Sequence, residues 1–143
     1  LHFKSNPIMK KILIPGILTG IFLLISSFLA LFLTIKLFPS LAWEYFGPTF
    51  NTDGSRDILF YIHPFLLGLA LAWFWNRVKE IFTGNSIAKA LEFSLIYAAI
   101  ATIPTMWITF SAINISLEMV LTWILYGLFQ ALVAGLILSR LNP

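Results

Sequence analysis

Long apolar segments alternate with short stretches of polar and turn-forming residues along the whole chain. Four such segments cover approximately residues 11–37, 57–82, 86–112 and 115–139. A helix needs about 20 mainly apolar residues to cross the hydrocarbon core of a bilayer, and each segment reaches that length. The pattern therefore predicts an all-α integral membrane protein, in which residues 1–143 form one membrane domain with four transmembrane helices in an antiparallel bundle.

The connections between the apolar segments differ in length. Residues 38–56 form the longest one, in which Ser40 can cap a short helix through Phe46 and Gly47 with Pro48 can end it. Its aromatic residues are typical of the headgroup layer, so we expect an outer cap with a short interfacial helix between the first two membrane helices. The other connections, near residues 83–85 and 113–114, are very short. We therefore expect the second, third and fourth helices to be consecutive antiparallel neighbours.

The first apolar segment begins in a way that is typical of bacterial membrane proteins. Met9, Lys10 and Lys11 directly precede it, so we interpret residues 1–8 as a non-native or alternative-start leader. The segment is longer than the apolar region of a secretory signal peptide, about 7–15 residues, and no small-residue cleavage site follows it. We expect a true transmembrane helix in a prokaryotic cytoplasmic (inner) membrane.

Composition agrees with the membrane class, and charge adds an orientation. The chain is 59% hydrophobic and 10% charged, whereas soluble domains are about 25% charged. Seven Lys and Arg residues flank one side of the predicted bundle, against Lys36 and Arg56 on the other. Because positive residues collect on the cytoplasmic side, this bias predicts cytoplasmic N and C termini and an outer cap. These flanks also explain the net charge of +3, so we expect no nucleic-acid partner.

Small residues recur at every fourth position within the apolar segments. Transmembrane helices pack where small side chains let two backbones approach, so these stripes predict helix contacts. The predicted packing residues are Gly127, Ala131, Gly135, Ser139, Gly68, Ala72, Gly16, Gly20 and, beside the fourth-segment stripe, Gln130. Either all stripes face one another inside one chain, or the stripe of the fourth segment is a seam between copies of the protein.

Pro104 interrupts the third apolar segment next to a row of hydroxyl residues. It removes the amide that would bond to the carbonyl of Ile100, so we predict a kink there. Thr102 and Thr105 flank the proline and could line a cavity at the kink. Such prolines also occur in membrane helices that have no role in transport.

Polar side chains within the apolar segments are the candidates for function, because placing them in a bilayer is unfavourable. His63, Glu118, Thr105 and Thr109 lie at similar depth below the predicted outer surface, with Tyr61 nearby. If they meet, a histidine–glutamate pair could bind a proton or a cation. The alternative is that the histidine bonds at the interface and the glutamate extends to the headgroups. At about 100° per residue, the glutamate lies on the helix face opposite the small-residue stripe.

The sequence offers little for cofactor or enzyme chemistry. His63 could ligate haem or a chlorophyll-type pigment, with Met106 or Met119 as second ligand, but His2 lies on the opposite side of the predicted membrane. The chain has no cysteine, phosphate loop, HExxH motif or serine–histidine–acid set. We therefore expect no enzyme activity, no metal site and no cofactor.

Three functions remain compatible with the sequence. The favoured one is a non-enzymatic accessory or self-associating subunit that acts through helix packing, with the lipid bilayer, further copies of itself or other membrane subunits as partners. The alternative is a homo-oligomeric transporter or channel for a small solute, ion or proton that uses the outer His63, Glu118 and threonine cluster. The third is a protein that binds lipid, quinone or pigment.

Overall fold

The computed structural model describes residues 9–143, and the leader predicted at residues 1–8 lies outside them. The described residues contain helices and connections but no β-strand. The helices form four rods, which are η1 with α1 (Met9–Leu13, Ile14–Leu37), α3 with η2 (Asp57–Val78, Lys79–Ile81), α4, η3 and α5 in series (Ser86–Tyr97, Ala98–Thr102, Ile103–Ala112), and α6 (Leu117–Leu141). Each rod is long and apolar enough to cross a membrane, as the hydropathy pattern predicted.

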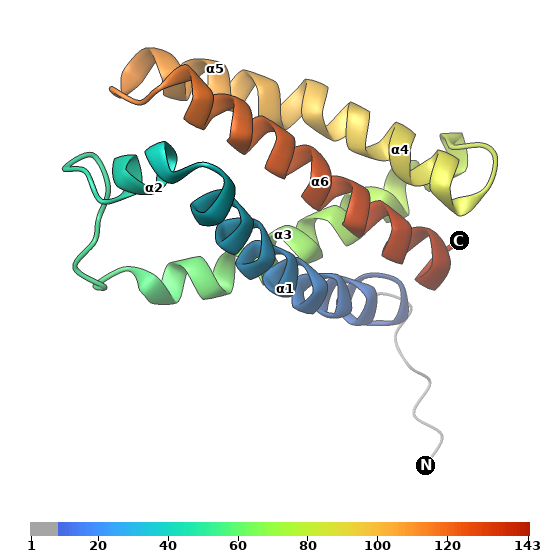
Figure 1. Ribbon diagram of the computed structural model, residues 1–143. Coiled ribbons are helices and arrows are strands. Elements are labelled where there is room, and N and C mark those ends of the chain that lie inside the picture. The colour runs from blue at the N-terminus through green and yellow to red at the C-terminus, as the bar shows by residue number, and fades with distance from the viewer. Residues whose placement is uncertain (1–8) are drawn as a thin grey trace.

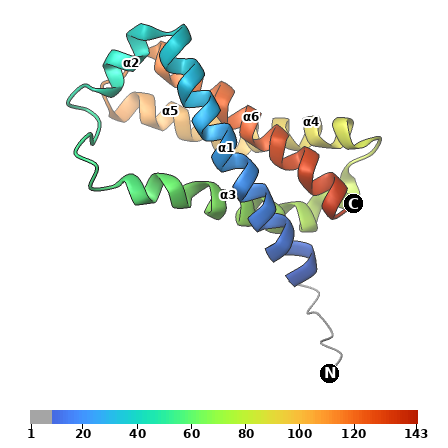
Figure 2. The same cartoon turned by 60° about the horizontal axis from the view of Figure 1, so that its bottom comes forward.

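The two ends of the bundle are built differently. At one end, α2 (Pro39–Tyr45) and residues 46–56 connect α1 to α3, and we call this the cap end (Figure 1). At the other end, Asn142 bonds to a residue of η1 and to one near the end of α3, and we call this the Asn142 end. Figure 1 shows that α3 and α5 diverge toward the cap end, and Figure 2 shows from a second side that α1 crosses α3.

Glycines bring α1 and α3 into direct backbone contact. A Cβ added to Gly68 would lie 2.5 Å from the carbonyl oxygen of Gly16 and 2.7 Å from the amide nitrogen of Gly20. A Cβ added to Gly20 would lie 2.9 Å from the Cα of Phe65. The crossing leaves no room for side chains at these positions, so the stripes of the first two rods pack against each other within the chain.

The stripe of α6 packs against the third rod. A Cβ added to Gly135 would lie 2.9 Å from the Cα of Ala90 in α4, and one added to Gly127 would lie 2.9 Å from Cγ2 of Thr102 in η3. Ala131, between the two glycines, is fully buried. The stripe is thus occupied inside the chain, which corresponds to the first of the two arrangements that the sequence left open.

An aromatic core closes the Asn142 end. Trp75 stacks on Phe82 with ring centroids 5.4 Å apart, and Phe93 packs edge-on against both rings. Ala134 and Leu138 of α6 complete this cluster. The core therefore joins the second, third and fourth rods near the connection between α3 and α4.

Asn142 links three segments beside this core. Its backbone carbonyl accepts a hydrogen bond from the Trp75 indole at 2.8 Å, and its side-chain amide donates to the Lys11 carbonyl and to Oδ1 of Asn76, each at 3.1 Å. Lys79 donates from Nζ to Oδ1 of Asn142 at 2.8 Å. These polar groups have partners, as is required where the protein excludes water.

The short helix α2 begins differently from the prediction. The sequence predicted Ser40 as its N-cap, but α2 begins at Pro39, and Phe38 occupies the N-cap position without a side-chain hydrogen bond. Proline suits the first turn of a helix because its missing amide would have no helical partner there. This preference moves the helix start ahead of the serine.

Contacts with α6 hold α2 against the bundle. The Glu44 carboxylate accepts a hydrogen bond from the amide of Ser116 at 2.7 Å, at the position where α6 begins. Leu41 is buried in a cluster with Met119 and Val120 of α6. The cap is therefore a docked part of the bundle rather than a loose connection.

The third rod is irregular where the kink was predicted. Over η3 the backbone hydrogen bonds have the wider spacing of a π-helix, and Pro104 follows in the first turn of α5. Because proline has no amide to donate, the regular ladder cannot continue through it. α4 buries Ala90, Phe93 and Ser94, whereas α5 buries none of its residues. The break thus separates a packed half from a loosely packed half.

The second and third rods are close neighbours only near their connection. Phe74 and Phe93 meet there with ring centroids 5.7 Å apart. Toward the cap end the two rods diverge (Figure 1), and His63 and Thr105 line a cavity between them. The two rods are therefore neighbours, as expected, but in close contact only near the turn that joins them, because a short turn limits the distance only at the ends that it joins.

Candidate functional site

A cavity of about 310 Å³ lies between α3, the third rod and α6 in the cap-end half of the bundle, and we name it the His63 cavity. Its polar lining consists of His63, Tyr97, Thr102, Thr105 and Gln130. Apolar side chains, among them Leu67 and Met106, form much of the remaining wall, and no Asp, Glu, Lys or Arg of the described chain contributes to it. The lining is therefore mainly apolar, with several polar groups and no fixed charge.

Most of these polar groups lack a partner in the protein. Within residues 9–143, the side chains of His63, Tyr97, Thr102 and Thr105 make no hydrogen bond, and neither does the amide oxygen of Gln130. His63 and Thr105 are exposed, whereas Thr102 and Gln130 are buried, and buried polar groups without a partner are unfavourable unless something outside the chain satisfies them. The convergence of several in one cavity indicates a place for a bound molecule.

Two of these side chains are almost completely enclosed by protein. Thr102 is 9% exposed and Gln130 is 5% exposed. Among the described residues, the only polar side-chain atom that is both fully enclosed and without a partner is Oγ1 of Thr19. The free polar atoms of Thr102 and Gln130 are therefore open to the cavity that these two residues line.

A directional row of hydrogen bonds runs from Gln130 through α6 to α1. The Ser27 hydroxyl donates its hydrogen to the Leu23 carbonyl at 2.8 Å. In the hydrogen bond between Ser27 and Tyr126, the donor must therefore be Tyr126. The Tyr126 oxygen in turn accepts from Nε2 of Gln130 at 2.8 Å. This row leaves Gln130 with one N–H and its carbonyl oxygen for the His63 cavity.

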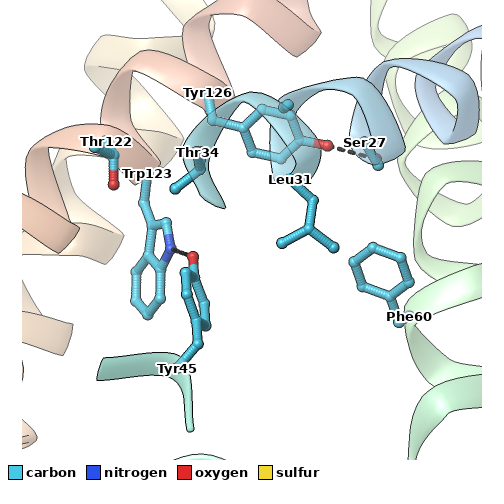
Figure 3. Close-up of a pocket in the computed structure, with 9 residues that line it drawn as sticks. Ser27, Leu31, Thr34, Tyr45, Phe60, Thr122, Trp123 and Tyr126 are labelled. Atoms are coloured by element: carbon cyan, nitrogen blue, oxygen red, sulfur yellow. Dashed lines mark hydrogen bonds between the residues drawn. The ribbon is translucent and has the colours of Figure 1, made fainter. Parts of the chain in front are cut away.

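A second cavity, of about 300 Å³, lies on the other side of Tyr126 and is named the Tyr45 cavity (Figure 3). Ser27 and Leu31 of α1, Phe60 of α3 and Tyr45 of α2 surround it. Trp123 donates from its indole N–H to the Tyr45 hydroxyl at 2.6 Å. Burial raises the pKa of Tyr45, and the hydrogen bond from Trp123 partly opposes that shift. The phenol thus acts as a neutral acceptor that holds α2 to α6.

The Tyr45 and His63 cavities share two walls. Trp123 and Tyr126 line both of them, and each of these side chains is hydrogen-bonded to a residue on the Tyr45 side. The partition is therefore held in place from outside the His63 cavity.

An apolar groove of about 360 Å³ adjoins the His63 cavity on the side of the Asn142 end, and we name it the Phe74 groove. It shares Leu67, Tyr97 and Ala101 with the cavity. Beyond these residues its walls include Phe74 of α3 and Ile100 of η3. A cavity with several polar groups and an apolar groove thus lie next to one another between the same two rods.

The structure brings together only some of the residues that the sequence singled out. His63 and Thr105 line the same cavity. Thr109 does not line it, and its hydroxyl donates to the Thr105 carbonyl at 2.8 Å. Glu118 is exposed and outside the cavity, and Tyr61 packs against Phe28 with ring centroids 6.0 Å apart. The polar group around His63 therefore forms without the glutamate.

The sequence indicated that Thr102 could line a cavity at the kink, but it did not reveal that Gln130 and Tyr97 line the same cavity. Gln130 and Thr102 lie on the packing faces of their helices, where a contact with a neighbouring helix is the simpler expectation. Pro104 was the one feature of the sequence that pointed to this cavity. A break in the helix two residues after Thr102 frees the threonine side chain from regular helix packing.

The residues do not fit a haem or a metal ion. Met106 lines the cavity with His63, but the volume of about 310 Å³ lies at the lower end of ligand sites, about 300–1,000 Å³, which suits one ring better than a macrocycle. Met119 is fully buried in the cap cluster. Within residues 9–143, no three His, Asp or Glu side chains come together as a metal site would require.

Comparison with known proteins adds no relative. No protein-family model matches the chain, and no curated protein or solved structure is significantly similar to it. The chemistry of the His63 cavity therefore has to be inferred from its own residues.

Proposed function

We propose that this is a non-enzymatic membrane protein that binds an amphipathic molecule taken up sideways from the bilayer. The polar head of the molecule lies in the His63 cavity, and its apolar chain lies in the Phe74 groove. One observation carries the proposal: polar side chains without partners gather in a cavity that adjoins an apolar groove between two diverging helices.

A bound head would relieve an unfavourable arrangement. Thr102 and Gln130 are held near the cavity by contacts with Gly127 and Tyr126, so they cannot turn away to reach water. Buried polar groups without hydrogen bonds destabilise a protein by about 1–3 kcal/mol each. A ligand that bonds to them gains affinity because the site is already formed and dehydrated.

The two functions that ranked higher on sequence grounds have less support from the geometry. The prediction of self-association was based on the small-residue stripe of α6, but the third rod of the same chain covers Gly127 and Gly135. The prediction of a transport function required His63 and Glu118 to share a site, but the glutamate does not line the His63 cavity. Association with other membrane subunits stays a prediction.

Identification of the molecule that copurifies with the protein tests this proposal. Organic extracts of wild type and of a Thr102→Val/Gln130→Leu double variant are compared by mass spectrometry, each normalised to protein. We expect one lipid-soluble species near equimolar amount in the wild type and its loss from the double variant. Thr34→Val, which alters the Tyr45 cavity instead, serves as the matched control and should keep the species. Equal extracts from all three proteins would contradict the proposal.

A further inference from the structure

We infer that the molecule held in the His63 cavity is an uncharged, single-chained lipid whose head carries carbonyl oxygens, which is the chemistry of a lipid-soluble quinone. This ligand class rests on the binding function proposed above and specifies it. Three properties of the site lead to it, namely its charge, its balance of hydrogen-bond donors and acceptors, and the shape of the space beside it.

The charge of the lining excludes ionic heads. Over residues 9–143, no Asp, Glu, Lys or Arg lines either the His63 cavity or the Phe74 groove. Arg77, at the other end of α3, lies over the Trp73 ring at 5.0 Å. A phosphate, carboxylate or ammonium head in the cavity would lack a counter-charge at membrane depth, where an unpaired charge is strongly unfavourable.

The hydrogen-bond balance calls for acceptors on the ligand. Tyr97, Thr102 and Thr105 each have one hydroxyl hydrogen to donate, Gln130 has one N–H left after its bond to Tyr126, and a neutral histidine has one N–H. Only the Gln130 oxygen and one ring nitrogen of His63 accept without also donating. The three hydroxyl oxygens can accept as well as donate, but all five donors can bond to an acceptor, and ligand carbonyl oxygens, which accept two bonds each, would satisfy several of them at once.

The depth and shape of the site favour a ring with one chain. His63 is six residues from the first residue of α3, Asp57, which corresponds to roughly 9 Å along a helix. If α3 begins at the membrane surface, a head at that depth lies below the layer of phospholipid phosphates. Aromatic side chains of Tyr97, Trp123 and Tyr126 border the cavity, and the narrow Phe74 groove adjoins it on the side of the Asn142 end. A planar head with one chain fits this arrangement better than a head with two acyl chains.

Four probes that have medium-length alkyl chains but different heads separate these properties. The detergent-purified full chain is titrated with decylbenzoquinone, dioctanoylglycerol, decanoic acid or decylbenzene, and dissociation constants are obtained from the rise in unfolding temperature. We expect the quinone to bind most tightly, and the acid and decylbenzene at least about tenfold more weakly. Thr102→Val and Thr105→Val should each weaken quinone binding by about fivefold, the effect of one lost hydrogen bond.

Thr109→Val is the control for these variants. It removes a hydroxyl one turn from Thr105 that lies outside the cavity, so quinone affinity should not change. Thr105 is exposed, so Thr105→Val remains informative even if Thr102→Val unfolds the protein.

Each other outcome has a defined meaning. Decanoic acid or decylbenzene binding as tightly as the quinone would overturn the inferred head chemistry, and tighter binding of dioctanoylglycerol would overturn the single-chain quinone class. In both cases the binding function would stand, provided that the extracted species depends on Thr102 and Gln130. If no probe binds and the extracts of wild type and double variant are equal, the ligand class and the binding function fail together.

Discussion

At the residue scale, Thr19 differs from the other buried hydroxyl residues of α1. It is fully buried, and its Oγ1 is the one enclosed polar side-chain atom without a partner among the described residues. Ser27, two turns further along α1, donates to the Leu23 carbonyl and also bonds to Tyr126. The two hydroxyls therefore contribute to stability with opposite sign.

Replacing Thr19 by valine should stabilise the protein. Thr19→Val keeps the shape of the side chain and removes an unsatisfied polar atom, so we expect the free energy of unfolding to rise by about 1 kcal/mol. Ser27→Ala, the matched comparison, should lower it because Tyr126 loses its acceptor. Unfolding by a denaturing detergent, followed by circular dichroism, measures both changes. A destabilised Thr19→Val protein would show that the hydroxyl has a partner.

At the element scale, α6 organises the bundle through three different contacts. Its beginning is held to α2 through Glu44, its middle bonds to α1 through Tyr126, and its stripe packs on α4 and η3. α1 and α3 form a separate pair that crosses at glycines. The diverging halves of α3 and the third rod are consequently anchored at the Asn142 end and free to separate at the cap end.

Adding one methyl group at the α1–α3 crossing should disrupt that pair. In Gly68→Ala the new Cβ would meet backbone atoms of Gly16 and Gly20, which cannot move without displacing the helix. We expect a loss of about 1–3 kcal/mol in the free energy of unfolding, as overpacking typically causes. Gly127→Ala is the control, because its Cβ would meet only the Thr102 side chain, and it should lose less. Equal losses would contradict the close backbone contact at the crossing.

Hydropathy was enough to predict the helical rods but not their pairing. The predicted segment 57–82 and the observed Asp57–Ile81 nearly coincide, because backbone groups in a bilayer must bond within a helix. Small residues such as Gly68 and Gly135 marked close approach correctly, but spacing alone does not say which neighbour approaches. The assignment of Gly135 to α4 depends on tertiary contacts that no local pattern encodes.

The candidate site could be predicted only in part for the same reason. His63 and Thr105 stood out because polar side chains are rare in apolar segments. Gln130 joins them only because η3 and Pro104 interrupt the third rod and leave a space beside α6. Glu118 seemed suitable by depth, but its position on the opposite face of α6 from the stripe leaves it exposed.

At the scale of the whole molecule, one end of the bundle is closed and the other is open. The Asn142 end has an aromatic core and a satisfied polar cluster, whereas the cap-end half contains the His63 and Tyr45 cavities on either side of Tyr126. Large apolar side chains such as Ile25, Leu95 and Leu125 are exposed around the rods. A lipid environment would cover them, and it would also supply an amphipathic ligand directly to the groove between α3 and the third rod.

Occupation of the His63 cavity by a membrane molecule can be detected beside Thr105. The chain contains no cysteine, so Thr105→Cys and Thr109→Cys each provide a single attachment point for a nitroxide label, one turn apart on α5. The measurement is the electron paramagnetic resonance line shape of each label while delipidated protein is titrated with the neutral lipid fraction of its host membrane. We predict that the label at position 105 becomes immobilised in a saturable way and that the label at 109 does not. Equal responses at both positions, or none at position 105, would contradict binding in this cavity.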